Sequence, residues 1–360
     1  MEQNPARAMI AMSGGVDSAV AALLMRQAGY DCVGATMRLY RDPGYQTACE
    51  RRCCSDTDEE DAAFVCAELG IPHESVCLTK RFAAQVIDPF VSEYTAGRTP
   101  NPCIDCNRYL KFDALLSHAL SEGCSVLATG HYARVTHDAR TGRYQLRKAL
   151  DGAKDQSYVL YMLTQAQLAH LRFPLGELRK TEVRALAERL GLVIAQKRDS
   201  QDICFVPDGD CGAFIERWTG VKSPPGDILD THGRVVGRHA GLTRYTVGQR
   251  RGLGLAMGEP VYVRAKDAAR NALIVGPRRE LLCREIKAED VCWLSVPEPP
   301  GPIRAAVRTR YHQPEQPASV YPLEQGRARI VFDVPQSAPA PGQAAVFYDG
   351  ELVLGGGTIT

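Results

Sequence analysis

The sequence lacks any apolar run long enough to cross a membrane, which excludes a helical membrane protein. Residues 1–8 have no apolar stretch typical of a secretion signal, so we expect a cytoplasmic protein. The formal net charge is only +1, from 43 basic and 42 acidic residues. Overall charge therefore gives no argument for nucleic-acid binding, although an arginine-rich C-terminal third is consistent with a local basic face.

Two common phosphate-binding signatures are also missing, the Walker loop and the dinucleotide motif G-x-G-x-x-G. The chain instead carries Ser13-Gly14-Gly15-Val16-Asp17-Ser18 between an apolar run and a helix-like run. Glycines let the backbone approach a ligand, and the amide groups and dipole of the following helix favour an anion. Ser13 and Ser18 add hydroxyl donors, and Asp17 could hold a metal or fix the loop. We therefore predict a phosphate-binding loop.

The 360 residues suffice for two or three domains. The first part alternates strand-like and helix-like segments, which predicts an α/β domain with a Rossmann-like parallel sheet. Glycine-punctuated short runs predict a small central β-containing domain, and regularly spaced short strands predict a C-terminal β-barrel. We place the domains at residues 1–215, 216–282 and 283–360.

The thirteen cysteines, without a secretion signal, indicate a reduced set of thiols and no disulfide framework. Cys32, Cys66, Cys77 and Cys124 stand in apolar surroundings and are expected to be packed inside. A second cluster of cysteines consists of Cys49, Cys53 and Cys54. The sequence indicates no role for it.

A C-x-x-C pair, Cys103 and Cys106, precedes a helix-like run. A thiol near a helix N-terminus has a lowered pKa, and Arg108 and Lys111 would add to this effect on Cys106. The pair is compatible with a redox couple, half a metal site or a catalytic thiol. Cys204, after a polar run, is the most suggestive third thiol. A phosphate loop for ATP combined with reactive thiols suits adenylation of a substrate oxygen followed by sulfur insertion.

Together these strings resemble those of the tRNA-specific 2-thiouridylases, within the ATP pyrophosphatases, over essentially the whole chain. The matching strings are 13–18 (SGGVDS), 101–112 (NPCIDCNRYLKF, in part), 128–134 (ATGHYAR), 154–158 (KDQSY), 200–205 (SQDICF) and 245–254 (YTVGQRRGLG). The resemblance implies a sulfurtransferase that uses ATP and Mg²⁺ to adenylate O2 of the wobble uridine (position 34) in tRNAs for Lys, Glu and Gln. Sulfur then displaces AMP.

The resemblance also implies roles for individual residues. Cys106 would be the nucleophile and Cys204 the carrier of a persulfide, in a cycle that includes a disulfide bond. ATP would be bound by Ala11, Met12, Ser13, Gly14, Gly15, Val16, Asp17, Ser18, Met37 and Gly130. The tRNA anticodon stem-loop would be contacted by Asn101, Pro102, Cys103, His131, Lys154, Asp155, Gln156, Arg310, Tyr311 and Gln343, the first three of them facing the target base.

Cys103 departs from the family pattern, in which many members carry Asp at this position. Cys103, Cys106 and Cys204 are enough thiolates for a [4Fe–4S] cluster with one open iron, which could deliver sulfide in place of the persulfide. The sulfur donor would be a persulfide or sulfide source, such as a cysteine desulfurase relay. The sequence leaves these two sulfur routes open.

Two other functions are compatible with parts of this sequence. An ATP pyrophosphatase that adenylates a small-molecule carboxylate or purine would share the loop but would not need the β-rich C-terminal part. A non-enzymatic RNA-binding protein with a structural metal would leave the SGGVDS loop unexplained. Formation of AMP and pyrophosphate with and without tRNA separates the three.

Overall fold

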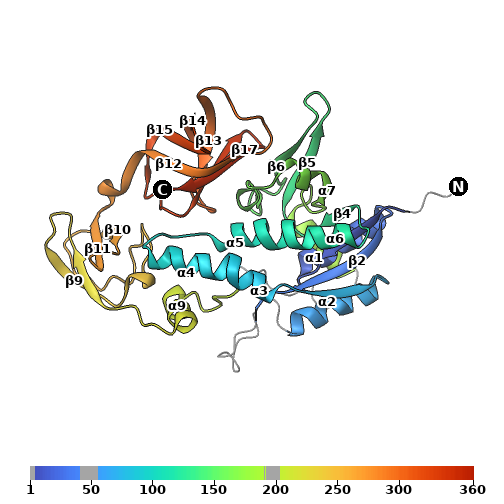
Figure 1. The fold of residues 1–360 in the computed structure, drawn as a ribbon, viewed down its shortest axis with the longest axis horizontal. Helices are drawn as coiled ribbons and strands as arrows, with labels where there is room; N and C mark the ends of the chain where they lie inside the picture. The colour runs from blue at the N-terminus through green and yellow to red at the C-terminus, as the bar shows by residue number, and fades with distance from the viewer. Residues whose placement is uncertain (1–4, 41–55, 190, 192–202) are drawn as a thin grey trace.

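The computed structural model describes residues 5–40, 56–189, 191 and 203–360. Three units are arranged around a helical centre (Figure 1). A parallel sheet with its helices lies at one end, a small β domain at the other, and a barrel sits above the middle. In the part of the chain that the structure describes, no helix has the length and apolar character of a membrane span.

The parallel sheet confirms the predicted α/β fold. Its strands among the described residues run in the order β3-β2-β1-β4-β7. They are β1 (Arg7–Ala11), β2 (Asp31–Arg38), β3 (His73–Cys77), β4 (Val126–Ala128) and β7 (Leu171–Arg172). Alternate residues of β1 enter two different cores: Met9 on one face, Ala8 and Ile10 on the other. This period of two explains why β1 is apolar from Ala8 to Ala11, since both faces of the sheet are covered here.

Helices cover both faces of this sheet. On one face lie α1 (Val16–Gln27), α2 (Asp56–Glu68) and α8 (Lys180–Arg189). On the other lies a helical hairpin, residues 79–121. Its outgoing arm is α3 (Thr79–Phe82), η1 (Ala83–Ile87) and α4 (Asp88–Thr95), and its returning arm is α5 (Pro102–Asp105), η2 (Cys106–Leu115) and α6 (Leu116–Ser121).

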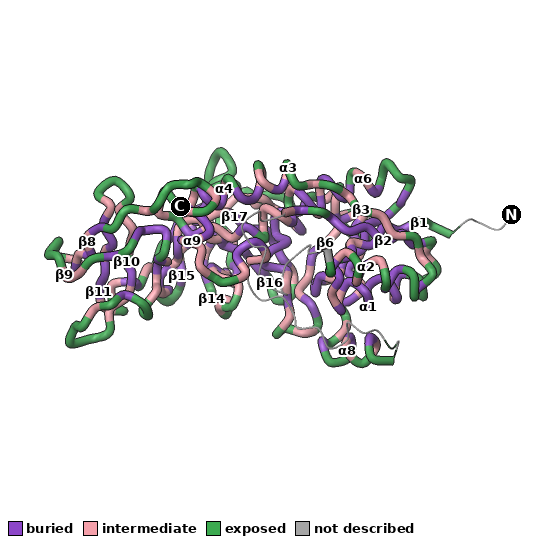
Figure 2. Tube along the Cα trace, turned by 90° about the horizontal axis from the view of Figure 1, so that it is seen from below, coloured by how far each residue is buried: buried purple, intermediate pink, exposed green. Residues whose placement is uncertain are grey.

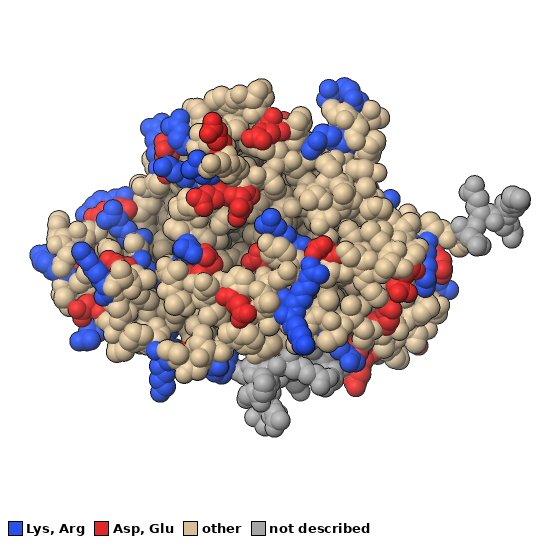
Figure 3. Space-filling view, viewed as in Figure 1, with Lys and Arg blue, Asp and Glu red and all other residues tan. Residues whose placement is uncertain are grey.

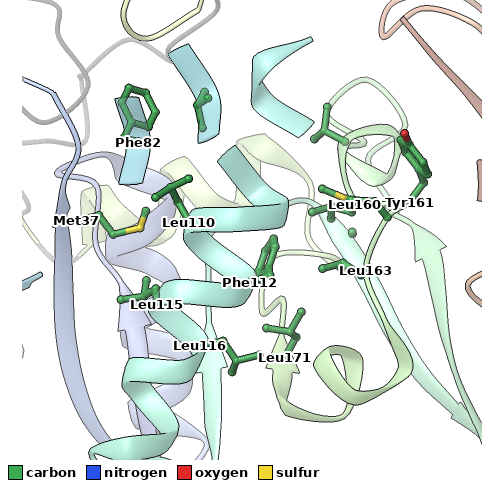
Figure 4. Close-up of a cluster of buried hydrophobic side chains, with 14 of the residues drawn as sticks. Met37, Phe82, Leu110, Phe112, Leu115, Leu116, Leu160, Tyr161, Leu163 and Leu171 are labelled. Carbon is green, nitrogen blue, oxygen red and sulfur yellow. The ribbon is translucent and has the colours of Figure 1, made fainter. Parts of the chain in front are cut away.

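The returning arm begins at Pro102, so the C-x-x-C pair lies within the arm instead of preceding its helix. Both η1 and η2 are π-helical, a rare conformation that is frequent at functional sites. The arm packs its apolar residues toward the sheet: in Figure 4, Leu110 and Leu115 lie beside Met37 of β2. The hairpin thus carries residues 96–101 away from the sheet, toward the two β domains.

A β-hairpin that the sequence reading placed in the first domain belongs to another sheet. It consists of β5 (Ala133–Asp138) and β6 (Arg143–Lys148). β6 pairs with the last strand of the barrel through Leu352 and Arg147, which extends the barrel sheet. The short elements that follow are η3 (Ser157–Val159) and α7 (Gln165–His170).

The central domain contains a small sheet, as predicted. Within the described residues its strand order is β10-β11-β8-β9. The strands are β8 (Gly226–Leu229), β9 (Val235–His239), β10 (Val261–Asp267) and β11 (Ala272–Pro277). Helix α9 (Cys211–Thr219) and the short helices η5 (Leu242–Arg244) and η6 (Arg278–Leu281) flank it. The expected boundary at residue 215 lies inside α9, and the two domain boundaries stay a prediction.

The C-terminal barrel is confirmed. Its six strands, counted in the described chain, close because β12 pairs with both β15 and β17. They are β12 (Leu282–Trp293), β13 (Ile303–Arg308), β14 (Gln316–Leu323), β15 (Arg327–Ser337), β16 (Ala344–Asp349) and β17 (Leu352–Ile359). Val346, Tyr348 and Val353 share one apolar core with the parallel sheet. Figure 2 shows buried residues running along the middle of the molecule from β1 and β2 to β16.

Candidate functional site

The predicted phosphate loop connects the carboxyl end of β1 to α1. Ser18 Oγ accepts from the Ser13 amide (3.2 Å) and donates to the Gly15 carbonyl (2.9 Å), which closes the loop on itself. Gly14 has φ +67°, and a Cβ there would collide with the Asp58 carbonyl of α2. Gly15, the N-cap of α1, provides no side-chain acceptor for the first turn. The loop is therefore prefolded around the N-terminal end of a 12-residue helix.

Asp17 fixes this loop to two other segments. Its carboxylate accepts Lys180 Nζ at 2.7 and 2.8 Å and the Tyr132 hydroxyl at 2.8 Å. Lys180 and Tyr132 are buried. A Cβ on Gly130 would lie 2.8 Å from the Asp17 carbonyl carbon and 3.0 Å from the Ser18 nitrogen, so this position accommodates only glycine. The sequence left open whether Asp17 holds a metal or fixes the loop, and in the structure its carboxylate fixes the loop.

The residues predicted to bind ATP do meet at one rim of the sheet. Gly130 follows β4 and touches the loop, and Met12 donates its amide to the Ala35 carbonyl of β2 (2.8 Å). Met37, near the carboxyl end of β2, is buried in the apolar core (Figure 4). Parallel strands present ligands at their carboxyl ends, which is where this loop lies.

The predicted thiols lie at the tip of the helical hairpin. Asn101 caps α5 by accepting the Cys103 amide on Oδ1 (3.1 Å), and Pro102 occupies the first turn. Cys103 is exposed, whereas Cys106 is half-buried and borders the same apolar core as Cys204. We call residues 101–106 the cysteine turn.

A preformed iron–sulfur site is not found. Across residues 5–40, 56–189, 191 and 203–360, no three His, Cys, Asp or Glu side chains are grouped closely enough to hold a metal ion. Cys103, Cys106 and Cys204 all lie in this part of the chain, so their arrangement here does not fit a cluster. Cys49, Cys53 and Cys54 lie outside the described residues.

One of the four cysteines expected inside is exposed instead. Cys32, Cys66 and Cys124 are buried, and burial raises the pKa of the Cys66 thiol to about 12. Cys77 is exposed at the end of the edge strand β3, and a hydrogen bond with Thr79 lowers its pKa. The apolar context of Cys77 misled the prediction, because β3 is an edge strand of the sheet and its residues are only partly buried.

Several residues predicted to contact tRNA have structural contacts here. His131 is buried between Phe112 and Phe173, and its burial together with the Lys111 charge lowers its pKa far below the usual value. Asp155, also buried, accepts from the Ala149 and Ser157 amides (3.1 and 3.2 Å). Their contact with tRNA remains a prediction, as do the roles of Pro102, which is buried, and of Lys154, which is half-buried.

Three other residues predicted to contact tRNA, Gln156, Arg310 and Tyr311, also have contacts within the protein. Gln156 Oε1 accepts from the Tyr132 amide (2.9 Å). Arg310 donates to the carbonyls of Val247 (3.0 Å) and Ala338 (2.7 Å), and so bridges the central domain and the barrel. Tyr311 lies near Asp155 and Cys103, and burial together with these two groups raises its pKa to about 12. Basic and acidic residues are interspersed on the face shown in Figure 3.

Sequence reasoning missed Lys180 and Lys266. Lys180 is the first residue of α8, where the helix dipole disfavours a cation. That mismatch was a signal for a nearby acidic partner, which the structure identifies as Asp17. Lys266 had no sequence signal, because its partners are backbone carbonyls of distant residues.

Comparison with known proteins decides the family. Family models match residues 6–208 (tRNA methyl transferase HUP domain), 212–277 (tRNA methyl transferase PRC-barrel domain) and 283–359 (Aminomethyltransferase beta-barrel domain). The protein named tRNA-specific 2-thiouridylase MnmA from Acetivibrio thermocellus is 47% identical over 354 residues, covering 98% of this chain and 99% of that protein. The chain belongs to the tRNA-specific 2-thiouridylase family.

Two further members of the tRNA-specific 2-thiouridylase family show similar agreement. The protein from Moorella thermoacetica is 49% identical, covering 98% of each chain. That from Symbiobacterium thermophilum is 49% identical, covering 98% of this chain and 92% of its own. Both bear the name tRNA-specific 2-thiouridylase MnmA.

Proposed function

We propose that this protein is a tRNA-uridine 2-sulfurtransferase, which uses ATP to replace O2 of the wobble uridine by sulfur. The observation that carries the proposal is the full-length likeness to 2-thiouridylases in a chain whose SGGVDS loop is folded as an anion site. The family models' descriptions refer to methyl transfer, whereas the curated relatives are named for thiolation. A prefolded phosphate loop in the same chain as the cysteine turn supports thiolation.

In the first step, uracil O2 attacks the α phosphate of ATP, an O2–phosphorus bond forms, and pyrophosphate leaves. The Ser13–Ser18 amides and hydroxyls and the end of α1 would bind the phosphates. Mg²⁺ would reduce the negative charge on the phosphates, with Asp17 as the acidic residue of the loop. In this structure Lys180 occupies both Asp17 oxygens, so these residues suit loop fixation better than direct metal binding.

In the second step, sulfur displaces AMP. The terminal sulfur of a Cys204 persulfide attacks C2, AMP leaves, and the uridine is tethered to Cys204 through an S–S bond. Attack of the Cys106 thiolate on the Cys204 sulfur breaks that bond, leaves the sulfur on the uridine and forms a Cys106–Cys204 disulfide. A cellular thiol reductant must then reopen the disulfide, and a persulfide donor must reload Cys204.

The test is ATP turnover by the purified protein with and without unmodified tRNA, combined with mass spectrometry of the digested tRNA. We expect pyrophosphate release that depends on tRNA, and 2-thiouridine when a sulfide or persulfide source is added. Equal AMP formation without tRNA would favour adenylation of a small molecule, and no ATP consumption would favour a non-enzymatic RNA-binding protein.

A Cys103→Ala variant separates the two sulfur routes. The persulfide route uses Cys106 and Cys204 and predicts that this variant keeps substantial activity. A [4Fe–4S] route predicts brown, oxygen-sensitive wild-type protein and loss of both colour and activity in the variant. Iron and sulfide content of anaerobically purified protein provides the second readout.

A further inference from the structure

We propose that Lys266 of the central domain is a positioning residue for Cys106, because it holds the chain segment that leads into the cysteine turn. That segment, residues 97–100, is called the approach segment below. This inference rests on the proposed function for its effect on catalysis, but the positioning itself can be measured without tRNA.

Lys266 of β10 makes three contacts, one within the central domain and two with the helical hairpin. Its Nζ donates to the Tyr245 carbonyl (3.0 Å) and to the Arg98 carbonyl (3.4 Å), and it lies 5.0 Å from the centre of the Tyr94 ring. Gly97 has φ +84°, and a Cβ there would lie 3.3 Å from Lys266 Cβ. The backbone of the approach segment therefore packs directly on Lys266.

The ammonium group is suited to this place by electrostatics. Arg98 follows the C-terminus of α4, where the helix dipole and the terminal carbonyls attract a cation. Among the described residues no carboxylate forms an ion pair with Lys266, since Glu93 of α4 is paired with Arg98. Carbonyl oxygens and an aromatic face thus replace the usual acidic partner.

Burial lowers the pKa of Lys266 to about 8. The titratable groups facing it are Tyr94 and the Cys211 thiol, whose pKa values burial raises. These two groups are neutral at neutral pH, so the charge in this contact is that of Lys266. As pH rises through about 8, the folded protein loses this charge and the contact weakens.

The barrel holds the other end of the approach segment. The Thr99 amide donates to the Pro341 carbonyl (2.8 Å), and Gln343 Nε2 donates to the Thr99 carbonyl (2.6 Å). Only Pro100 separates Thr99 from Asn101, the cap of α5. The central domain and the barrel therefore both fix the starting point of the cysteine turn, and Lys266 supplies the central domain's part.

The experiment compares Lys266→Met, Lys266→Arg and the wild type as full-length proteins. Lys222→Met serves as the matched control, because Lys222 is exposed in the same part of the chain. The first readout is the rate at which iodoacetamide alkylates Cys106, followed by peptide mass spectrometry at about pH 7 and about pH 9. The others are kcat for thiolation and KM for ATP.

We expect Lys266→Met to change the Cys106 alkylation rate several-fold and to lower kcat by about tenfold, with KM for ATP unchanged. Lys266→Arg keeps its charge and should match the wild type at the lower pH. At the higher pH the wild-type rate should approach that of Lys266→Met, whereas Lys266→Arg should not change in this way. Lys222→Met should behave as wild type throughout.

Wild-type alkylation rates in Lys266→Met at both pH values would overturn the proposal. So would a parallel loss of ATP binding and thermal stability, since that indicates a general structural role. If Lys266→Met does not fold, the comparison of Lys266→Arg with the wild type at the higher pH decides: identical behaviour overturns the proposal. Absence of tRNA thiolation in the wild type would refute the proposed function alone, because alkylation is independent of it.

Discussion

The phosphate loop and the cysteine turn are held in place in opposite ways. The loop is fixed from within its own domain, by Ser18 on the backbone and by Lys180 and Tyr132 on Asp17. The cysteine turn is fixed from outside, because its approach segment contacts Lys266 of the central domain and Gln343 of the barrel. The adenylating part of the site is thus complete within the parallel-sheet domain, whereas the sulfur part depends on all three domains.

This difference suits an enzyme that must not release sulfur without its RNA. Both β domains contact the segment before Cys103 and Cys106, through Lys266 and Gln343. We therefore expect a change in the contacts of either β domain to affect the thiols and to leave the phosphate loop undisturbed. The following predictions separate the two parts, from the largest effect to the smallest.

The largest effect is expected from Cys106→Ala and Cys204→Ala. Each should abolish 2-thiouridine formation, because each removes a sulfur that the transfer needs. Pyrophosphate release with tRNA should continue, since adenylation involves only ATP and uracil O2. Cys283→Ala, a half-buried thiol of β12, is the control and should retain both activities. Loss of pyrophosphate release in either active-site variant would mean that the two parts cannot be separated.

Lys180→Met should impair the loop and spare the turn. It leaves the Asp17 carboxylate without its cation, and should cost about 3 kcal/mol in the free energy of unfolding. We expect pyrophosphate release to fall by about a hundredfold, because the loop loses its fixed geometry. Urea unfolding and ATP turnover measure these effects. The Cys106 alkylation rate should equal that of the wild type, and a changed rate would contradict the independence of the two parts.

Gly342→Ala should impair the cysteine turn and leave the phosphate loop unchanged. Gly342 has φ +90°, and a Cβ would lie 3.1 Å from the Thr99 backbone, so alanine must push the approach segment. We expect sulfur transfer to fall by about tenfold with ATP binding unchanged, as measured by single-turnover thiolation and calorimetry.

Gly350→Ala is the matched control, because Gly350 also has a positive φ (+56°) but no atom within 4 Å of the added Cβ. It should lose a similar amount of stability, about 1 kcal/mol, and keep the rate of sulfur transfer. Equal activity losses in both variants would show that strain alone, rather than the contact with Thr99, slows the reaction.

The smallest effect concerns the support of the loop by α2. Hydrogen bonds from Arg38 and Ser75 lower the pKa of Glu59 to about 2. The stability from these contacts is therefore complete above the unfolded pKa of about 4.5 and is lost as pH falls toward 2. Glu59→Gln should cost less than about 1 kcal/mol at neutral pH. The difference between the two proteins in urea unfolding should shrink on acidification, and a constant difference would refute this assignment.

Much of the first domain was readable because its signals are local. The central strands β1 and β4 are short apolar runs buried on both faces, and the loop follows β1 directly. The sequence analysis did not predict that residues 133–148 form a hairpin on the barrel sheet, since Arg147 and Lys148 pair with Leu352 and Glu351, about two hundred residues away. The early start of α5 was missed because Pro102 and Cys103 resemble a loop when the Asn101 cap is not considered.

The sequence by itself determined the family, the place of the phosphate loop between a strand and a helix, and the order of an α/β part followed by a β-rich part. Each of these depends on residue type and spacing over a few positions. Only the tertiary structure decided that Lys180 closes on Asp17, that Cys77 is exposed, and that Lys266 and Gln343 hold the entry to the cysteine turn. These contacts join residues far apart in the chain, and several of them use backbone carbonyls as acceptors. Because every residue carries a backbone carbonyl, the residue pattern does not indicate which one accepts the hydrogen bond.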